Sequence, residues 1–451
     1  MTQPGFHLRS AAMLLSCLLT LVVAQRANAG EFDRAYRAAL DYDAKYQTAK
    51  FSLSYTEEGI PLARASLLPS ISANVSDTAV RGTRDISGTP STDLDYRTPS
   101  QSISLRAPIF NADGLQQVKQ AQAQLDTAKA QFASRSADLI DRLTVAYLQR
   151  MLAEDNFQVI HSQTQAVVEQ RNLMRKRLDR GEGTKTELAE ARANLSLVQA
   201  QWADARDQVT NARIALEMIS GEKRESMPRL GISFTPTALA PAALDKWQEM
   251  AIAANPDVEV KRRAIEVAKA SVARSNAGHM PRLDLVASVG SSRNESISTL
   301  NQGVNQTAVG LQLNIPIYGG GAVSAAVRQA LAEQARAESD LLSEQRALDM
   351  EIKRLFQLVQ NGRAKLEAYD EALESSRLAL DGTQKGQASG LRTNSDVLEA
   401  VRKVSQGERD LAQARYEHIL QRLRLFNKAG LPTETVVSYV DDMLTSQAKA
   451  R

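Results

Sequence analysis

The sequence is poor in cysteine and in aromatic residues. Its only cysteine is Cys17, so a mature chain that begins beyond this position can form no disulfide and offers no thiol nucleophile or thiolate metal ligand. Aromatic residues make up 5% of the 451 residues, whereas Ala, Gln, Leu, Arg and Glu fill long stretches. This composition is typical of extended helices with shallow packing seams rather than of large compact cores.

Groupings that would support catalysis or cofactor binding are also missing from the sequence. The histidines beyond the N-terminal region are His161, His279 and His418, which are dispersed and lack the spacing of metal ligands. The segment YGGGA at 318–322 lacks the Lys and Ser/Thr of a phosphate-binding loop. We therefore expect no catalytic residue, no cofactor and no metal, and predict that the protein is not an enzyme.

The N-terminus carries a short apolar run. Residues 11–24 read AAMLLSCLLTLVVA and are followed by ANA before Gly30, which predicts a secretory signal peptide, residues 1–29, cleaved after Ala29. The run is too short for a transmembrane helix, which needs roughly 20 apolar residues. The LLSC segment faintly resembles a lipoprotein cleavage site, so lipidation of Cys17 is an alternative.

The mature chain has almost no net charge. Removing residues 1–29 removes Arg9 and Arg26 and leaves 53 basic residues against 52 acidic ones, which gives no support for nucleic-acid binding. The mature chain also lacks an apolar stretch of 18 residues. An exported chain of this kind is either soluble outside the cytoplasm or a β-barrel of the outer membrane.

The chain contains an internal duplication with an offset of about 209 residues. Landmarks recur at this offset: Pro69 and Pro281, Pro108 and Pro316, Gly181 and Gly390, Glu187 and Asp396. We predict a first repeat at 30–220, with a helix, strands at about 66–78 and 100–110, a long helix at 114–180 and a helix at 184–220. A linker at 221–245, in an equatorial position, precedes a second repeat at 246–429. That repeat comprises a helix, strands at about 281–291 and 306–318, a long helix at 322–385 and a helix at 392–429, and an equatorial tail follows at 430–451.

The predicted strands alternate between apolar and polar residues. The apolar positions are Ile71, Ala73, Val75, Ile103, Leu105, Ala107, Ile109, Leu283, Leu285, Ala287, Val289, Val309, Leu311, Leu313, Ile315 and Ile317. The polar segments 79–99 and 291–306 between the strands are typical of exposed loops. A sheet packed on a soluble core would also alternate, but the sequence contains no second apolar sheet to cover this face. We therefore favour a face exposed to outer-membrane lipid.

Four strands cannot close a membrane barrel alone. Each open edge would leave about five unsatisfied backbone groups in hydrocarbon, at several kcal/mol each. Two copies would supply 8 strands, which enclose little space, whereas three would supply 12 and leave a lumen. The expected fold is therefore mixed α and transmembrane β: a homotrimer in which each chain gives one third of a 12-stranded barrel joined to a long α-helical barrel.

Four motifs identify the sequence as similar to the TolC-like outer-membrane efflux and secretion family. They are ANPDV (254–258), GHMPRLDLVASVG (278–290), LQLNIPIYGGGAVSAAVRQA (311–330) and GLRTNSDVLEA (390–400). The resemblance implies a trimeric channel in the outer membrane that extends into the periplasm of a Gram-negative cell. It also implies a periplasmic adaptor protein and an inner-membrane ABC transporter, or a proton-driven pump, as partners.

The resemblance places the two Gly turns, at Gly181 and Gly390, at the periplasmic tip. Asp396 and Glu399, with their repeat partners Glu187 and Glu190, would then form acidic rings at the aperture. Acids at helix starts also favour the helix dipole, which is the alternative role for Glu187 and Glu190. Arg392 would latch the aperture by facing Thr186 and Glu187. The four prolines Pro69, Pro108, Pro281 and Pro316 are expected at strand ends, where the missing N–H is tolerable.

The sequence indicates the cargo less clearly than it indicates the fold. The turn RGEGTKTELAEA (180–191) is more similar to type I protein-secretion members than to drug-efflux lipoproteins, so we expect a passive exit duct for exported protein. The outer-membrane component of a multidrug efflux pump, with small-molecule cargo, is the alternative. A soluble periplasmic coiled-coil adaptor or scaffold would explain the helices but not the amphipathic strands.

Overall fold

The computed structural model describes residues 30–225, 227–228, 230, 236–296 and 299–448. The predicted signal peptide lies outside these residues. The chain divides into two compact units. The helical unit comprises Met1–Ala49, Ala133–Pro256 and Gln345–Arg451, and the sheet unit comprises Lys50–Phe132 and Asp257–Glu344.

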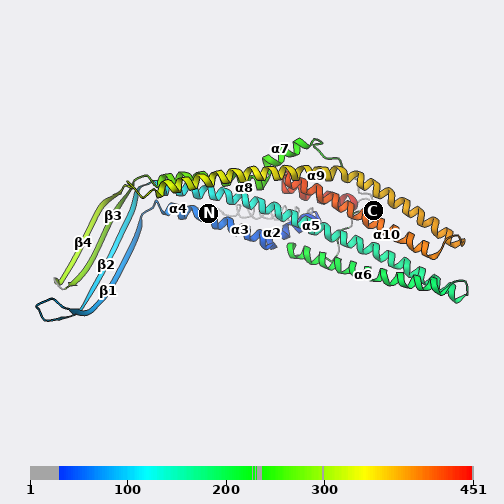
Figure 1. The fold of residues 1–451 in the computed structure, drawn as a ribbon, viewed down its shortest axis with the longest axis horizontal. Helices are drawn as coiled ribbons and strands as arrows, with labels where there is room; N and C mark the ends of the chain where they lie inside the picture. The colour runs from blue at the N-terminus through cyan, green and yellow to red at the C-terminus, as the bar shows by residue number, and fades with distance from the viewer. Residues whose placement is uncertain (1–29, 226, 229, 231–235, 297–298, 449–451) are drawn as a thin grey trace, which may run out of the picture. The chain divides into compact units, whose positions relative to one another are not determined.

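The element order repeats once along the chain (Figure 1). The first half contains α2 (Glu31–Tyr42), α3 (Ala44–Glu57), α4 (Gly59–Ala65), β1 (Ser70–Arg84), β2 (Thr92–Asn111), α5 (Ala112–Asp179) and α6 (Lys185–Ser220). The second contains α7 (Leu244–Ala254), α8 (Pro256–Ala277), β3 (Arg282–Ser296), β4 (Thr299–Asn314), α9 (Ala322–Ala388), α10 (Asn394–Lys428) and α11 (Thr433–Ala448). With 68 and 67 residues, α5 and α9 are each about 100 Å long. No helix among the described residues is long and apolar enough to cross a membrane.

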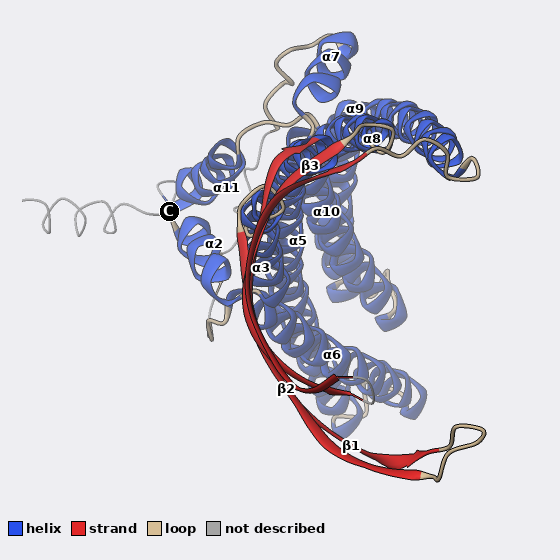
Figure 2. Ribbon diagram, turned by 90° about the vertical axis from the view of Figure 1, so that its left-hand side faces the viewer, coloured by secondary structure: helices blue, strands red, loops and turns tan. Residues whose placement is uncertain are grey.

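The sheet unit is built on one four-stranded antiparallel sheet of order β1-β2-β3-β4. The two hairpins join through β2 and β3, and the sheet curves along its strands (Figure 2). The register brings the predicted apolar residues opposite one another, as for Ile103 with Val289 and Leu285 with Leu311. Strands β1 and β4 are the two edges of this sheet.

The strands extend well beyond the predicted ranges, so most of the two expected loops is strand. β1 continues to Arg84 and pairs there with Thr92 of β2. On the face that carries the apolar residues, this extension is charged: Arg97 Nη1 lies 3.7 Å from Asp77 Oδ2, and Arg81 Nε lies 3.6 Å from Asp95 Oδ1. The apolar band therefore ends near Val75, and a polar hairpin continues past it.

The four prolines differ in their place relative to the strands. Pro69 and Pro281 directly precede β1 and β3. Pro108 instead lies inside β2, where the register shifts between Pro108 and Phe110. This bulge leaves Ile109 without a partner on β3 and pairs Phe110 with Leu283, so the strict alternation of the two faces is interrupted there.

The predicted end of β4 is also wrong. The strand stops at Asn314, and Ile315, Pro316 and Ile317 follow it. Pro316 cannot donate to the ladder, and the glycines after it turn the chain with positive φ at Gly320 and Gly321. This turn leads directly into α9.

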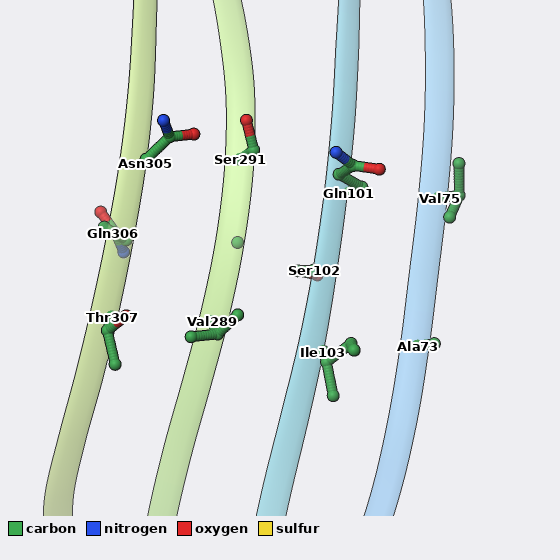
Figure 3. Close-up of a pocket in the computed structure, with 11 residues that line it drawn as sticks. Ala73, Val75, Gln101, Ser102, Ile103, Val289, Ser291, Asn305, Gln306 and Thr307 are labelled. Carbon is green, nitrogen blue, oxygen red and sulfur yellow. The ribbon is translucent and has the colours of Figure 1, made fainter.

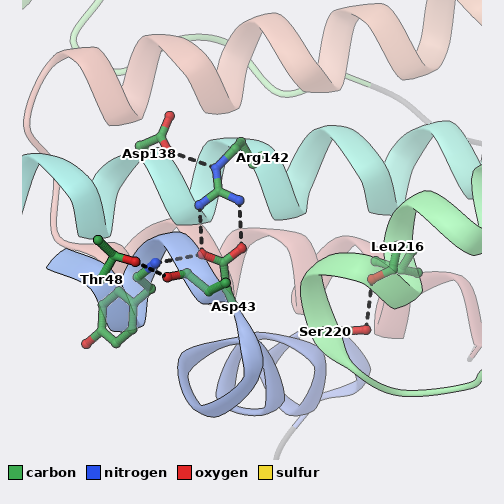
Figure 4. Close-up of polar contacts among 8 residues, drawn as sticks. Asp43, Thr48, Asp138, Arg142, Leu216 and Ser220 are labelled. Atoms are coloured by element: carbon green, nitrogen blue, oxygen red, sulfur yellow. Dashed lines mark hydrogen bonds and ion pairs between the residues drawn. The ribbon is translucent and has the colours of Figure 1, made fainter. Parts of the chain in front are cut away.

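The helical unit has its own core. Phe32 of α2 packs edge-on against Tyr147 of α5, with ring centroids 5.1 Å apart, and both side chains are fully buried. Asp43 separates α2 from α3, accepts a hydrogen bond from the Tyr46 N–H and receives a two-point contact from Arg142, at 2.8 and 3.0 Å (Figure 4). Burial alone would raise the pKa of Asp43, but the hydrogen bonds from Arg142 and Tyr46 lower it. The interruption of the helix at Asp43, between α2 and α3, is thus held against α5 by Arg142.

His418 makes the stability of the helical unit depend on pH. Its ring packs against Gly362 of α9, where an added Cβ would lie 2.5 Å from Nδ1. Burial, with Arg422 nearby, lowers the pKa of His418 to about 4. Because the unfolded chain would bind this proton at about pH 6.5, the free energy of unfolding should be constant above pH 6.5. It should then fall as the pH drops towards 4.

We expect this loss to be about 1–2 kcal/mol. Thermal unfolding of wild type and of His418→Gln, followed between pH 7 and pH 4.5, measures it: wild type should lose more of its melting temperature than the variant. His161→Gln, at an exposed position, is the matched control and should keep the wild-type slope. Equal slopes for all three proteins would contradict the assignment.

Candidate functional site

The turn between α5 and α6 is a closed, hydrogen-bonded unit. Gly181 adopts a positive φ of 77°, which ends α5 with the N–H of Glu182 donating to Arg177 O at 2.9 Å. Thr184 then begins α6: its hydroxyl accepts from the Glu187 N–H at 3.1 Å, and its own N–H donates to Glu187 Oε2 at 2.7 Å. This reciprocal pair is a capping box and fixes the side chain of Glu187 at the helix start.

The turn between α9 and α10 repeats the same arrangement. Gly390 has φ of 76°, and the Leu391 N–H donates to Gly386 O at 2.9 Å. Thr393 and Asp396 form the second capping box, at 2.9 and 3.2 Å. The internal duplication therefore preserved a local structure as well as a sequence spacing.

The capping boxes keep both acids ionised. The hydrogen bond from the Thr184 backbone and that from its hydroxyl lower the pKa of Glu187, and Thr393 lowers the pKa of Asp396 in the same way. Each turn thus carries a negative charge at neutral pH. The alternative role for Glu187 at a helix start is present in the structure, and Asp396 shares it.

The other two acids lie one turn further along their helices. Glu190 is exposed on α6. Glu399 is near two cations of α10, with Oε1 3.9 Å from Arg402 Nη2 and 3.3 Å from Lys403 Nζ. These basic groups offset part of the charge of Glu399, and Arg392 acts on Asp396 in the same sense.

The two turns are staggered along the helices. Asn394, at the start of α10, accepts a hydrogen bond from Gln170 Nε2 at 2.6 Å, and Gln170 lies nine residues before the end of α5. Leu398 packs with Val167 of α5 and with Leu195 and Val198 of α6. At 1.5 Å per residue, the α9–α10 turn is set back by about 13 Å from the α5–α6 turn.

This stagger also separates the residues of the predicted latch within one chain. Arg392 lies beside its own turn, where its N–H donates to Gly386 O at 3.2 Å. The packing of α10 places it nearer the level of Gln170 than that of Thr186 or Glu187. Within one chain the structure therefore does not bring the predicted latch residues together, and any such contact has to join two copies.

The curved sheet presents a second candidate surface. An open hollow of ≈ 520 Å³ crosses all four strands (Figure 3). Its lining includes Val75, Ile103, Val289 and Thr307, with Gln101 at its polar end. The hollow thus lies on the apolar face, where aliphatic side chains give way to polar ones.

The opposite face of the sheet is polar and hydrogen-bonded across strands. Ser72 pairs with Ser104 at 2.8 Å and Ser76 with Ser100 at 2.9 Å. Asp284, which is buried, accepts from Arg282 Nε at 3.1 Å and lies 3.9 Å from Arg106 Nε. The sequence does not predict the pairing of Asp284 with Arg106, because the β2–β3 register that joins them is not encoded locally.

No group of acidic, histidine or cysteine side chains among the described residues could hold a metal ion. The arrangement offers instead two charged helical turns and a two-faced sheet.

The sequence profile described as "Outer membrane efflux protein" matches residues 35–222 and 247–431. The chain is 32% identical to the proteases secretion protein PrtF of Dickeya chrysanthemi, over 95% of this chain and 94% of that protein. It is 31% identical to the alkaline protease secretion protein AprF of Pseudomonas aeruginosa, over 90% of this chain and 85% of that protein. Among solved structures, the Campylobacter jejuni CmeC outer membrane channel matches with a TM-score of 0.75 and 15% identity, over 92% of this chain and 89% of that one.

Proposed function

Because this chain belongs to the outer membrane efflux protein family, we propose that three copies form a channel in the outer membrane that serves as the passive exit duct of a type I protein-secretion system. The channel receives its cargo from an inner-membrane ABC transporter through a periplasmic adaptor. Transport energy comes from these partners. The relatives named for protease secretion support exported protein as the cargo.

One observation supports the proposal that three copies assemble: the sheet has two open edges, β1 and β4, and an uncovered apolar face. Backbone groups at an edge need partners in hydrocarbon, so β4 of one copy pairs with β1 of the next. Three copies give 12 strands with the apolar face towards lipid and the serine-rich face towards the lumen.

Two measurements test the proposal. Native mass spectrometry of detergent-extracted protein should give the mass of three mature chains, and a monomer recovered without detergent would favour the soluble scaffold. In a strain that lacks the gene, the proteins exported by the partner ABC transporter should disappear from the culture medium. They should reappear when the gene is restored. Unchanged secretion with increased drug sensitivity would favour multidrug efflux instead.

The acids of the α9–α10 turn should make the periplasmic aperture attractive to cations. The double variant Asp396→Asn with Glu399→Gln removes both charges, while the Asn oxygen can still accept from the Thr393 N–H. We expect reconstituted channels of this variant to lose most of their cation preference, measured as the reversal potential in a salt gradient. Glu417→Gln, at an exposed position about six turns away on α10, should leave the reversal potential unchanged.

Arg392 is proposed to latch the aperture by reaching Thr186 or Glu187 of a neighbouring copy. Arg392→Ser should therefore raise the single-channel conductance of reconstituted trimers several-fold. Arg402→Ser, which removes a nearby exposed cation from α10, is the control. A conductance equal to that of wild type would remove Arg392 from this role.

A further inference from the structure

The C-terminal helix α11 supplies the cap of the first helix of the chain. α2 and α11 pack side by side within the helical unit (Figure 2). The N–H of Phe32 donates to Asp441 Oδ1 at 2.9 Å and that of Asp33 donates to Oδ2 at 3.1 Å. Gly30, the N-cap residue, has no side chain that could do this. The carboxylate of Asp441, about 410 residues away in the sequence, therefore accepts the hydrogen bonds of two free N–H groups in the first turn of α2.

Gly30 is in direct contact with this carboxylate. A Cβ added at Gly30 would lie 1.9 Å from Asp441 Cγ and 2.2 Å from each of its oxygens. These distances are far below any contact that real atoms make, so the position accepts glycine alone unless Asp441 moves. The main chain of Gly30 thus lies directly against a negative charge.

The surroundings of Asp441 favour an added positive charge. Burial raises the pKa of Asp441, and the nearby carboxylates of Asp33 and Asp442 raise it further. The hydrogen bonds from the Phe32 and Asp33 N–H groups lower it, but they do not outweigh these effects. Other charged groups in this region include Glu31, Arg34 and Arg37 of α2, of which Arg37 Nε lies 2.9 Å from Asp33 Oδ2. Arg224 Nη1 donates to Glu31 O at 3.1 Å. A cation at Gly30 would lie against the carboxylate of Asp441 and offset its charge.

We propose that signal-peptide cleavage creates this cation: the new α-ammonium group of Gly30 binds Asp441 and fastens the two ends of the chain together. Hydrolysis of the Ala29–Gly30 bond by a signal peptidase consumes one water, leaves a carboxylate on Ala29 of the released peptide and an amine, then protonated, on Gly30. The unprocessed chain has only a neutral amide N–H there. The inference rests on the cleavage expected after Ala29 and is independent of the cargo.

The ion pair has a further physical reason. A positive charge at a helix N-terminus opposes the helix dipole, whereas a carboxylate there favours it. Asp441 therefore serves α2 in both forms of the chain, but only in the mature chain does it also neutralise the terminal ammonium. Processing should consequently tighten the docking of α11 onto α2.

The reactivity of the terminal amine tests the proposal on the mature protein extracted in detergent. N-terminal sequencing should first show Gly30 as residue one. Acetylation of the α-amine, followed by peptide mass spectrometry across pH 6–10, should then give a midpoint of about 9 or above, against 7.7–8.0 for an unpaired terminus. At pH 7 the amine of Asp441→Asn should react about tenfold faster than that of wild type.

Two further variants complete the test. Asp442→Asn removes the charge of the exposed neighbour of Asp441 and should change the reaction rate far less than Asp441→Asn does, because the carboxylate of Asp441 is the one that lies against Gly30. Gly30→Ala, which forces Asp441 away, should react as Asp441→Asn does and replaces it if that variant fails to assemble. A mature terminus other than Gly30 would overturn the cleavage premise, and a wild-type midpoint near 8 would overturn the ion pair. Neither result bears on the channel itself.

Discussion

Leu311→Arg is expected to prevent most of the protein from assembling in the outer membrane. Leu311 lies on the edge strand β4, pairs with Leu285, and is 67% exposed in the single chain. Val309 and Leu313 flank it on the same face. If this face meets lipid, an arginine near the middle of the bilayer costs roughly 2–4 kcal/mol per copy, and a trimer incurs the cost three times.

The measurement is the amount of trimer in the outer-membrane fraction, together with its resistance to heat in detergent. Ala308→Arg is the matched control, because it places the same charge three residues away on the opposite, polar face, beside Ser288. It should assemble nearly as wild type does. Equal assembly of both variants would mean that the apolar face does not face lipid.

The sequence was sufficient to predict the family, the duplicated order of elements and the two faces of the sheet. The resemblance carried by the four motifs is confirmed by the profile match, and the strand alternation by the register of Ile103 with Val289. These features are encoded locally, as period-two patterns and helix-breaking glycines. Predicting them does not require knowing which residues far apart in the sequence contact one another.

The stagger of the two helical turns could not be predicted in this way. An offset of about 209 residues makes Gly181 equivalent to Gly390 but does not set their relative height. That height depends on long-range packing, in which Leu398 meets Leu195 and Val198. The resemblance that implies Arg392 facing Thr186 and Glu187 carries no information on this height, which the contact between Gln170 and Asn394 gives within one chain.

The extended hairpin β1–β2 was missed for a different reason. Segment 79–99 is rich in Gly, Ser, Thr and Asp, which is the composition of loops. Outside the apolar band both faces of a hairpin contact water, so the alternation that identifies a strand disappears. The pairing of β1 with β2 and the ion pairs of Asp77 with Arg97 and Arg81 with Asp95 stabilise strand there despite the composition.

Arg422→Ala should destabilise the helical unit strongly. Arg422 of α10 is buried and donates through Nη1 to Thr237 O and, at 3.3 Å, through Nη2 to Ala238 O. Its guanidinium also lies 5.5 Å from the ring centre of Phe426 and 5.0 Å from that of Tyr439 on α11. One side chain thus joins α10, the segment before α7, and α11.

Removing this side chain leaves two carbonyls without their donor and opens space between two aromatic rings. We expect the free energy of unfolding to fall by about 2–4 kcal/mol, seen as a lower melting temperature and as faster proteolysis near residue 237. Arg424→Ala, two residues away, breaks a half-exposed contact with Asp141 at 3.3 Å and should cost at most about 1 kcal/mol. Equal losses from the two variants would show that the guanidinium contacts of Arg422 do not hold the segment before α7 and α11 against α10.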